Sequence, residues 1–113
     1  MGEARLRTDI AMAALVRRAA SAGAAAFVVR RGAEEAGAAL VKVTTLDGQC
    51  RVYAQGFRDG ARIWYPLTGP AAVSDHEGEE RIARARGRDP DLWVVEVEDR
   101  QGRHFLVEPV VDA

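Results

Sequence analysis

The residues best suited to chemistry lie near the C-terminal end of the sequence, where carboxylates are dense. Carboxylate oxygens are the ligands that hard cations prefer, but this stretch lacks the glycine-spaced loop of calcium sites. Zinc sites need clustered cysteines and histidines, whereas this chain has one cysteine and two histidines that lie 28 positions apart. We therefore predict no metal site, and interpret the carboxylates as a helix end followed by the solvated face of a strand. They are Asp89, Asp91, Glu96, Glu98 and Asp99.

General acid–base catalysis would need a carboxylate beside a histidine. Glu96 and Glu98 share one face of a predicted strand, and His104 follows on the predicted return strand. If the turn pairs Glu98 with Arg103, His104 falls on the opposite face and Arg103 neutralises Glu98. This geometry argues against a carboxylate–histidine couple.

Nucleophilic and cofactor chemistry also lack a pattern. Cys50 falls on a strand face that we expect to be buried, where a free cysteine packs as a small hydrophobic residue. The sequence has no phosphate loop, dinucleotide fingerprint or nucleophile-elbow motif. We predict no catalytic residue and no cofactor. A small enzyme stays open as an alternative, but a non-enzymatic role is favoured.

Nucleic-acid binding is a second alternative, suggested by basic residues in a predicted helix. Four arginines there are the expected phosphate contacts, and exposed Lys42 and Arg51 beside aromatic residues can also serve a nucleic acid. Glutamates precede two of these arginines by four positions, so pairing along the helix competes with phosphate binding. The four are Arg81, Arg84, Arg86 and Arg88, and the expected pairs are Glu77 with Arg81 and Glu80 with Arg84.

A partner-binding surface is the favoured interpretation. Aromatic and basic side chains fall on the sheet face opposite the inferred core, and exposed aromatic clusters mark interfaces more often than enzyme sites. We expect a binding or assembly module whose partner is an unidentified protein or a second copy of the chain, through this face or through an edge strand. The expected contact residues are Arg51, Tyr53, Phe57, Arg62 and Trp64.

Composition bounds the class of protein. The chain has 113 residues, which suits one domain, 1–113, with frayed ends at about 1–4 and 109–113. A net charge of −1 argues against a dominant nucleic-acid or membrane-surface footprint. No run approaches the roughly 20 apolar residues of a membrane span, and we interpret the alanine-rich residues 19–26 as a helix end plus linker. The single cysteine suits a reducing compartment, so we expect a soluble cytoplasmic protein.

Periodicity and turn residues predict an α+β domain with the order α-β-β-β-β-α-β-β. It has two helices on one face of a mainly antiparallel sheet of five to six strands. The predicted helices span residues 8–22, with Thr8 as N-cap, and 75–86, with Ser74 and Glu77 forming a capping box. The predicted strands span residues 27–31, 40–46, 49–55, 61–67, 92–98 and 103–107.

The register of the first hairpin decides which residues are buried. Asp47-Gly48 suits a two-residue turn that pairs Leu46 with Gln49. Val43 then faces Val52 on the buried side, while Tyr53 lies on the solvated side. Asp59-Gly60 repeats the turn, and Pro66 predicts that the following strand lies at an edge of the sheet.

Six segments of the sequence together carry a family resemblance. They are RLRTDI at residues 5–10, ALVRR at 14–18, LVKV at 40–43, LDG at 46–48, DPDLWVVEVED at 89–99 and GR at 102–103. These segments resemble a small bacterial family known as domain of unknown function number 1491. The resemblance spans nearly the whole chain and implies a cytoplasmic protein of alphaproteobacterial type, but no catalytic residue. Two departures concern helix packing: Ala11, where a larger apolar residue is expected, and the glycine within the second helix.

Overall fold

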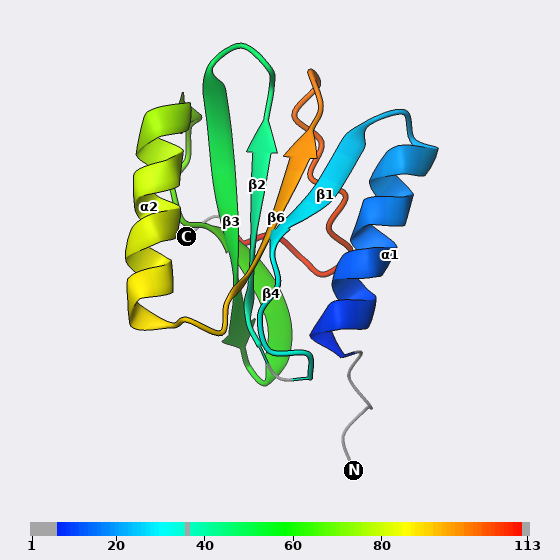
Figure 1. Ribbon diagram of the computed structural model, residues 1–113, viewed down its shortest axis with the longest axis vertical. Helices are drawn as coiled ribbons and strands as arrows, with labels where there is room; N and C mark the ends of the chain where they lie inside the picture. Colours follow the sequence, from blue (N-terminus) through cyan, green and yellow to red (C-terminus); the bar gives the residue numbers. More distant parts are fainter. Residues whose placement is uncertain (1–6, 36, 112–113) are drawn as a thin grey trace.

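Two helices and a six-stranded sheet make up the computed structural model, which describes residues 7–35 and 37–111 (Figure 1). Along the sheet the order is β1-β6-β2-β3-β4, with β2 and β6 parallel, the other neighbours antiparallel, and short β5 beside β3. The predicted α+β class with a mainly antiparallel sheet is confirmed. The helices are α1 (Thr8–Ser21) and α2 (Asp75–Arg88); the strands are β1 (Ala25–Arg30), β2 (Ala39–Thr44), β3 (Gln49–Arg58), β4 (Ala61–Pro66), β5 (Val73–Ser74) and β6 (Trp93–Glu98).

The N-cap of helix α1 lies one residue earlier than predicted. Arg7 holds the N-cap position and Thr8 is the first helical residue, so the prediction of Thr8 as N-cap is wrong. The Thr8 hydroxyl instead donates a hydrogen bond of 2.6 Å to the carbonyl oxygen of Gly37. This bond satisfies a buried hydroxyl and fixes the start of α1 to the segment before β2.

The β2–β3 hairpin closes through a three-residue loop, because Leu46 adopts a left-handed conformation at φ 65° before Gly48 at 85°. Thr44 therefore pairs with Cys50 and Val41 pairs with Tyr53, which shifts the predicted register by one residue. Residues paired in a sheet share a face, so Tyr53 joins the buried valines of β2. The predicted solvated position of Tyr53 is wrong.

The two helices lie on opposite faces of the sheet, not on one face as predicted. Met12 and Leu15 of α1 pack with Val41, and Ile82 of α2 packs with Leu40. Successive residues of a strand point to opposite faces, so Leu40 and Val41 assign the helices to different layers. The described residues therefore form a three-layer structure, with one apolar cluster on each side of the sheet.

Helix α2 begins as predicted, with the Ser74 hydroxyl accepting a hydrogen bond from the backbone N–H of Glu77. Its interior glycine has a packing role. A Cβ atom at Gly78 would collide with Sγ of Cys50 on β3. The absence of a side chain at Gly78 thus lets α2 lie close to the sheet.

The last predicted strand, residues 103–107, is not a strand. The turn after β6 has Gly102 at φ 73°, as expected, but the backbone N–H of Arg103 donates to the Asp99 carboxylate and Phe105 is left-handed at φ 60°. These features turn the chain away from β6. Residues 103–111, which we call the C-terminal tail, instead cross the face of the sheet that α1 covers.

Candidate functional site

The C-terminal tail covers the aromatic face that the sequence predicts to be exposed. Trp64 is 1% exposed and Tyr53 is 4% exposed, so their predicted exposure is wrong. The backbone N–H of Trp64 donates to the carbonyl of Pro109 at 2.9 Å, and the backbone N–H of Val111 donates to the Trp64 carbonyl at 2.8 Å. Residues 109–111 are therefore paired with β4, while residues 1–4 and 112–113, the rest of the ends predicted to fray, lie outside the described residues. Strand β4 is at a sheet edge, as Pro66 predicts.

Side chains hold the C-terminal tail in place at several points. The Arg18 guanidinium donates twice to the Phe105 carbonyl, at 2.8 and 3.1 Å, and the N–H of Leu106 donates to Nδ1 of His104. The His104 ring meets Tyr53 edge-on at 5.2 Å between centroids. Burial lowers the pKa of His104, and the charge of Arg51 lowers it further. Both effects favour the neutral imidazole, whose Nδ1 can accept the hydrogen bond from Leu106.

Arg51 lies between the sheet and the loop that follows β4. Its guanidinium is 5.3 Å from the centre of the Tyr53 ring and donates to the Gly69 carbonyl at 3.1 Å. The side chain is half-buried. Arg51 therefore holds the loop against the sheet.

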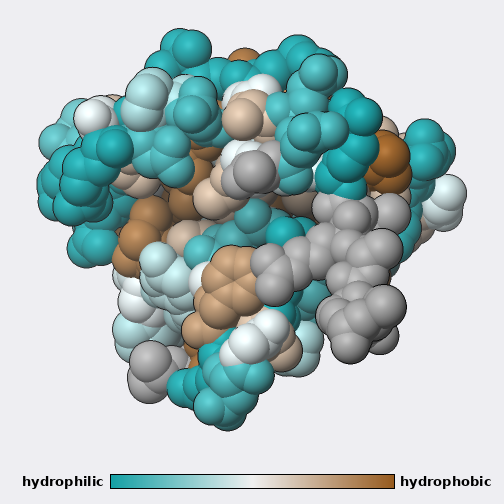
Figure 2. All heavy atoms as spheres, turned by 90° about the horizontal axis from the view of Figure 1, so that it is seen from below, coloured by the Kyte–Doolittle hydropathy of each residue, from teal (hydrophilic) through white to brown (hydrophobic). Residues whose placement is uncertain are grey.

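Phe57 and Arg62 are the predicted contact residues that stay accessible, at the far end of the β3–β4 hairpin. Phe57 is 56% exposed, and it is paired across the strands with half-buried Arg62. The Arg62 guanidinium lies 6.0 Å from the centre of the Phe57 ring. Figure 2 views the end of the molecule where this hairpin turns, and shows hydrophobic spheres in separate groups among hydrophilic ones. We call Phe57 and Arg62 the hairpin surface.

The four arginines of α2 differ in exposure. Arg84 and Arg88 are exposed, whereas Arg81 and Arg86 are half-buried. Arg81 donates to the Leu67 carbonyl at 2.9 Å and pairs with Glu77 at 3.6 Å, as predicted for that pair. Arg81 is therefore occupied by contacts within the chain.

A charged cluster on the α2 side of the sheet surrounds Lys42, which the sequence predicts to be exposed and which is buried. The Lys42 side chain is 8% exposed, and its Nζ lies 2.8 Å from Glu79, 3.5 Å from Asp75 and 3.8 Å from Glu96. Burial alone would lower the pKa of Lys42, but the hydrogen bond to Glu79 and the surrounding carboxylates raise it overall. The ammonium group therefore stays charged. The sequence feature that could have indicated this cluster is a single lysine within a mostly apolar strand.

Cys50 lies beside this cluster and is buried, as predicted. Burial raises its pKa to about 11, and nearby Asp75 adds to the rise. Burial also raises the pKa of Glu96, against the opposing charge of Lys42. A thiol with a raised pKa is a poor nucleophile, which supports the structural interpretation of Cys50.

Asp99 forms a fork with Arg103 in place of the predicted Glu98–Arg103 pair. Nε and Nη2 of Arg103 each donate to the Asp99 carboxylate at 2.9 Å. The hydrogen bond from Arg103 holds the pKa of Asp99 at about 2 despite the opposing effect of burial. The fork joins the end of β6 to the start of the C-terminal tail.

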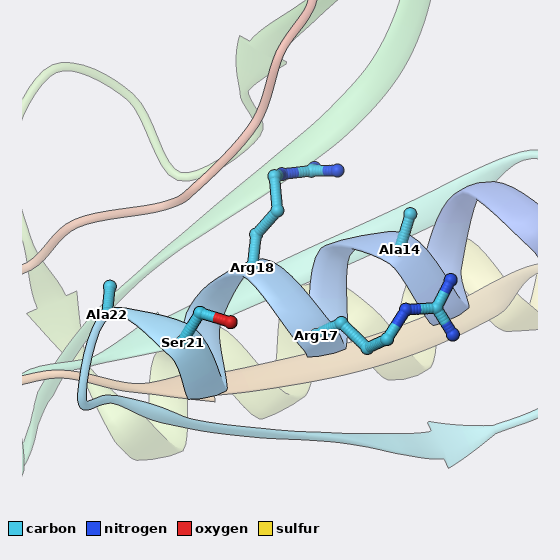
Figure 3. A pocket seen from close by; sticks show the side chains of 5 residues that line it. All are labelled: Ala14, Arg17, Arg18, Ser21 and Ala22. Atoms are coloured by element: carbon cyan, nitrogen blue, oxygen red, sulfur yellow. The ribbon is translucent and has the colours of Figure 1, made fainter.

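A shallow depression of about 590 Å³ lies along the C-terminal half of α1. It is lined by Ala14, Arg17, Arg18, Ser21 and Ala22. Figure 3 shows the Arg17 and Arg18 side chains pointing in different directions, and Arg18 is bonded to Phe105. An enzyme site would need acidic groups beside the arginines, but the lining includes neither Glu96 nor Asp99. The depression therefore does not bring Arg17 together with these carboxylates.

Two further classes of site concern the described part of the chain as a whole. No group of three or more Asp, Glu, His or Cys side chains in residues 7–35 and 37–111 is arranged to hold a metal ion. None of the helices described is long and apolar enough to cross a membrane.

Comparison with known proteins shows close relatives of the same fold. A crystal structure of a DUF1491 family protein from Caulobacter crescentus is 46% identical, with a TM-score of 0.86, covering 95% of this chain and all of that one. An NMR structure of a DUF1491 family protein from the same organism gives 46% identity, a TM-score of 0.83 and coverage of 96% and 99%. A solution structure of a protein from A. tumefaciens is 31% identical, with a TM-score of 0.82, and the match covers 97% of this chain and 98% of that one. No curated protein matches the chain.

The family comparison covers the elements described above. The model of the protein of unknown function family DUF1491 matches residues 6–107, from the residue before Arg7 to the middle of the C-terminal tail. The relatives from Caulobacter and A. tumefaciens agree with the alphaproteobacterial type that the resemblance implies. The chain belongs to the DUF1491 family of proteins of unknown function.

Proposed function

We propose that the protein is a non-enzymatic binding module that contacts another protein through the hairpin surface, Phe57 and Arg62. The observation that carries this proposal is the 56% exposure of Phe57 beneath an arginine guanidinium. Aromatic residues and arginine are enriched at the centres of protein interfaces, where a stacked pair offers apolar area together with hydrogen-bond donors.

The support beneath the hairpin surface favours binding over local flexibility. Trp64 follows Arg62 on β4 by two positions and is fixed by the C-terminal tail through backbone and side-chain hydrogen bonds. Gln55 precedes Phe57 on β3 and accepts a hydrogen bond from the N–H of Ala39. A contact pair on such a fixed base loses little conformational freedom on binding.

Quantitative cross-linking in a lysate of a bacterium that carries the protein tests this function. The double variant Phe57→Ala, Arg62→Ala is compared with the wild type and with Val107→Ala, which removes a 68%-exposed side chain elsewhere. We expect the double variant to lose its cross-linked proteins and the Val107 variant to retain them. An unchanged set of cross-linked proteins in the double variant would refute the hairpin surface.

Nucleic-acid contact through α2 is the second candidate, favoured by the exposure of Arg84 and Arg88. The engagement of Arg81 with Leu67 and Glu77 weakens it. Filter binding at two salt concentrations separates the candidates, because phosphate contacts weaken steeply as salt rises. Nucleic acid that is retained on the filter by the wild type, less so at high salt, and not by the double variant Arg84→Ala, Arg88→Ala would favour this candidate.

A further inference from the structure

We propose that the protein has a second binding site, over β6 and β1 on the α2 side of the sheet, which takes a basic amphipathic helix of a partner protein. The site is distinct from the hairpin surface and does not depend on it. We call it the open slot, defined by Ala25, Phe27, Val29, Glu96 and Glu98.

The two faces of the sheet are covered unequally. On one face, α1 packs with residues of β2 and β6, and the C-terminal tail packs on Tyr53 and Trp64. On the other face, α2 packs against β3 and β2 through Ile82, Val52 and Leu40, and Val94 of β6 belongs to the same buried cluster. Figure 1 shows α2 beside β3, away from β1. Coverage of the second face therefore stops before β1.

The uncovered width fits one helix. Neighbouring strands lie about 4.8 Å apart, and packed helices lie about 8–10 Å apart, so one helix covers about two strands. Since the cluster of α2 covers β3, β2 and Val94 of β6, a second helix beside it would cover β1 and the end of β6 that carries Glu96 and Glu98. The pairing of Phe27 with Glu96 and of Ala25 with Glu98 brings these residues to one face. Glu96 lies near Lys42, which contacts α2, so this is the α2 face.

Apolar side chains supply the floor of the open slot. Phe27 is 43% exposed and Val29 is 55% exposed, on a strand whose backbone makes no hydrogen bond to any described segment other than β6. Ala25 beside them is exposed as well. This strip is narrow and apolar, as the contact stripe of an amphipathic helix requires.

The charge of the open slot favours a basic partner helix. Lys42 is one cation among three carboxylates within 3.8 Å, those of Glu79, Asp75 and Glu96, so the cluster keeps excess negative charge. Glu98 adds to it, while Arg30, which pairs with Val94 and so shares this face, lies at the other end of β1 from Glu98. The raised pKa of Glu96, caused by burial and also by the charges of Glu79 and Glu98, agrees with a deficit of cations. Lysine or arginine from a partner helix would supply them.

Two synthetic helical peptides test the open slot, one with leucine and lysine in amphipathic order and one with glutamate in place of lysine. Amide chemical shifts of the full chain are followed during titration with each. We expect shifts along β6, β1 and the adjoining edge of α2, with the lysine peptide bound at least about tenfold more tightly. Phe27→Ala should weaken that binding about tenfold, and Glu98→Lys should reduce or reverse the preference for lysine.

Ile10→Ala is the matched control, since it truncates a 47%-exposed apolar side chain on α1, outside both the slot and the hairpin surface, and should bind the lysine peptide as the wild type does. Equal binding of the two peptides would overturn the proposal, as would shifts confined to other surfaces. Shifts at Phe27 that grow with protein concentration, without peptide, would assign the slot to a second copy of this chain and would also overturn it.

Discussion

The indole Nε1 of Trp64 donates a hydrogen bond of 2.9 Å to Oε1 of Glu108, across 44 positions of sequence. Two backbone hydrogen bonds flank it, joining Trp64 to Pro109 and Val111. The largest aromatic side chain of β4 is therefore held by the C-terminal tail, within the buried cluster that also contains Met12 and Leu15 of α1.

Replacing Glu108 with alanine should destabilise the fold. The buried indole N–H of Trp64 would lose its acceptor, and an unsatisfied buried donor costs about 1–3 kcal/mol. The free energy of unfolding in urea measures the loss. Glu35→Ala removes an exposed carboxylate elsewhere and should stay within about 0.5 kcal/mol of the wild type. Equal unfolding midpoints for the two variants would contradict this role of Glu108.

Alanine should have opposite effects at the two glycines of α2. At Gly78 its Cβ would strike Sγ of Cys50, so Gly78→Ala should destabilise by about 1–3 kcal/mol despite the better helix propensity of alanine. A Cβ at Gly87 meets nothing within 4 Å, so Gly87→Ala should stabilise by up to about 1 kcal/mol. In a Cys50→Ala background the penalty at Gly78 should shrink. A double-mutant cycle measured by urea unfolding would show no coupling if the clash is absent.

Acid should weaken the fold through Asp99. The Arg103 hydrogen bonds hold its pKa at about 2 in the folded chain, against a reference value of 3.8. The unfolded chain therefore binds the proton first, and the contribution of Asp99 is present above about pH 4 and is lost as pH falls toward about 2. Asp99→Asn should flatten the pH dependence of unfolding in that window. Asp91→Asn, in an exposed position, should leave the curve unchanged.

A separate pH dependence should come from His104. Its pKa lies below the reference value of 6.5 because the ring is buried, so protonation favours the unfolded chain. Stability from this group is complete above about pH 6.5 and decreases as pH falls below it. Comparison of urea midpoints at pH 7 and pH 5.5 should show a smaller difference in His104→Gln. His76, whose side chain is 85% exposed, gives the control His76→Gln.

Turn and capping residues allow much of the fold to be predicted. Ser74 caps α2 through its own side chain, and Gly60 and Gly102 have the positive φ values that their turns require. Pro66 correctly marks an edge strand. These features are local, so a short stretch of sequence contains the information.

The exposure of the aromatic residues on β3 and β4 is harder to predict, because the register of the first hairpin depends on one residue in its turn. Leu46 is not a residue type that favours positive φ, yet its left-handed conformation lengthens the first loop and reverses the face of Tyr53. The C-terminal tail shows no strand or helix period, so nothing in the sequence predicts that it encloses Trp64. The predicted exposure of Tyr53 and Trp64 fails for these two physical reasons, whereas Phe57, near the turn of the β3–β4 hairpin, is 56% exposed.

The position of Glu108 in the chain has a consequence for synthesis. Ribosomes add residues from the N-terminus, and early segments begin to fold before later ones emerge. Trp64 on a nascent chain would remain uncovered until Glu108 and Pro109 had followed it out. During that interval β4 would present an unpaired edge next to a large apolar ring, a combination that invites contact with chaperones or with neighbouring nascent chains.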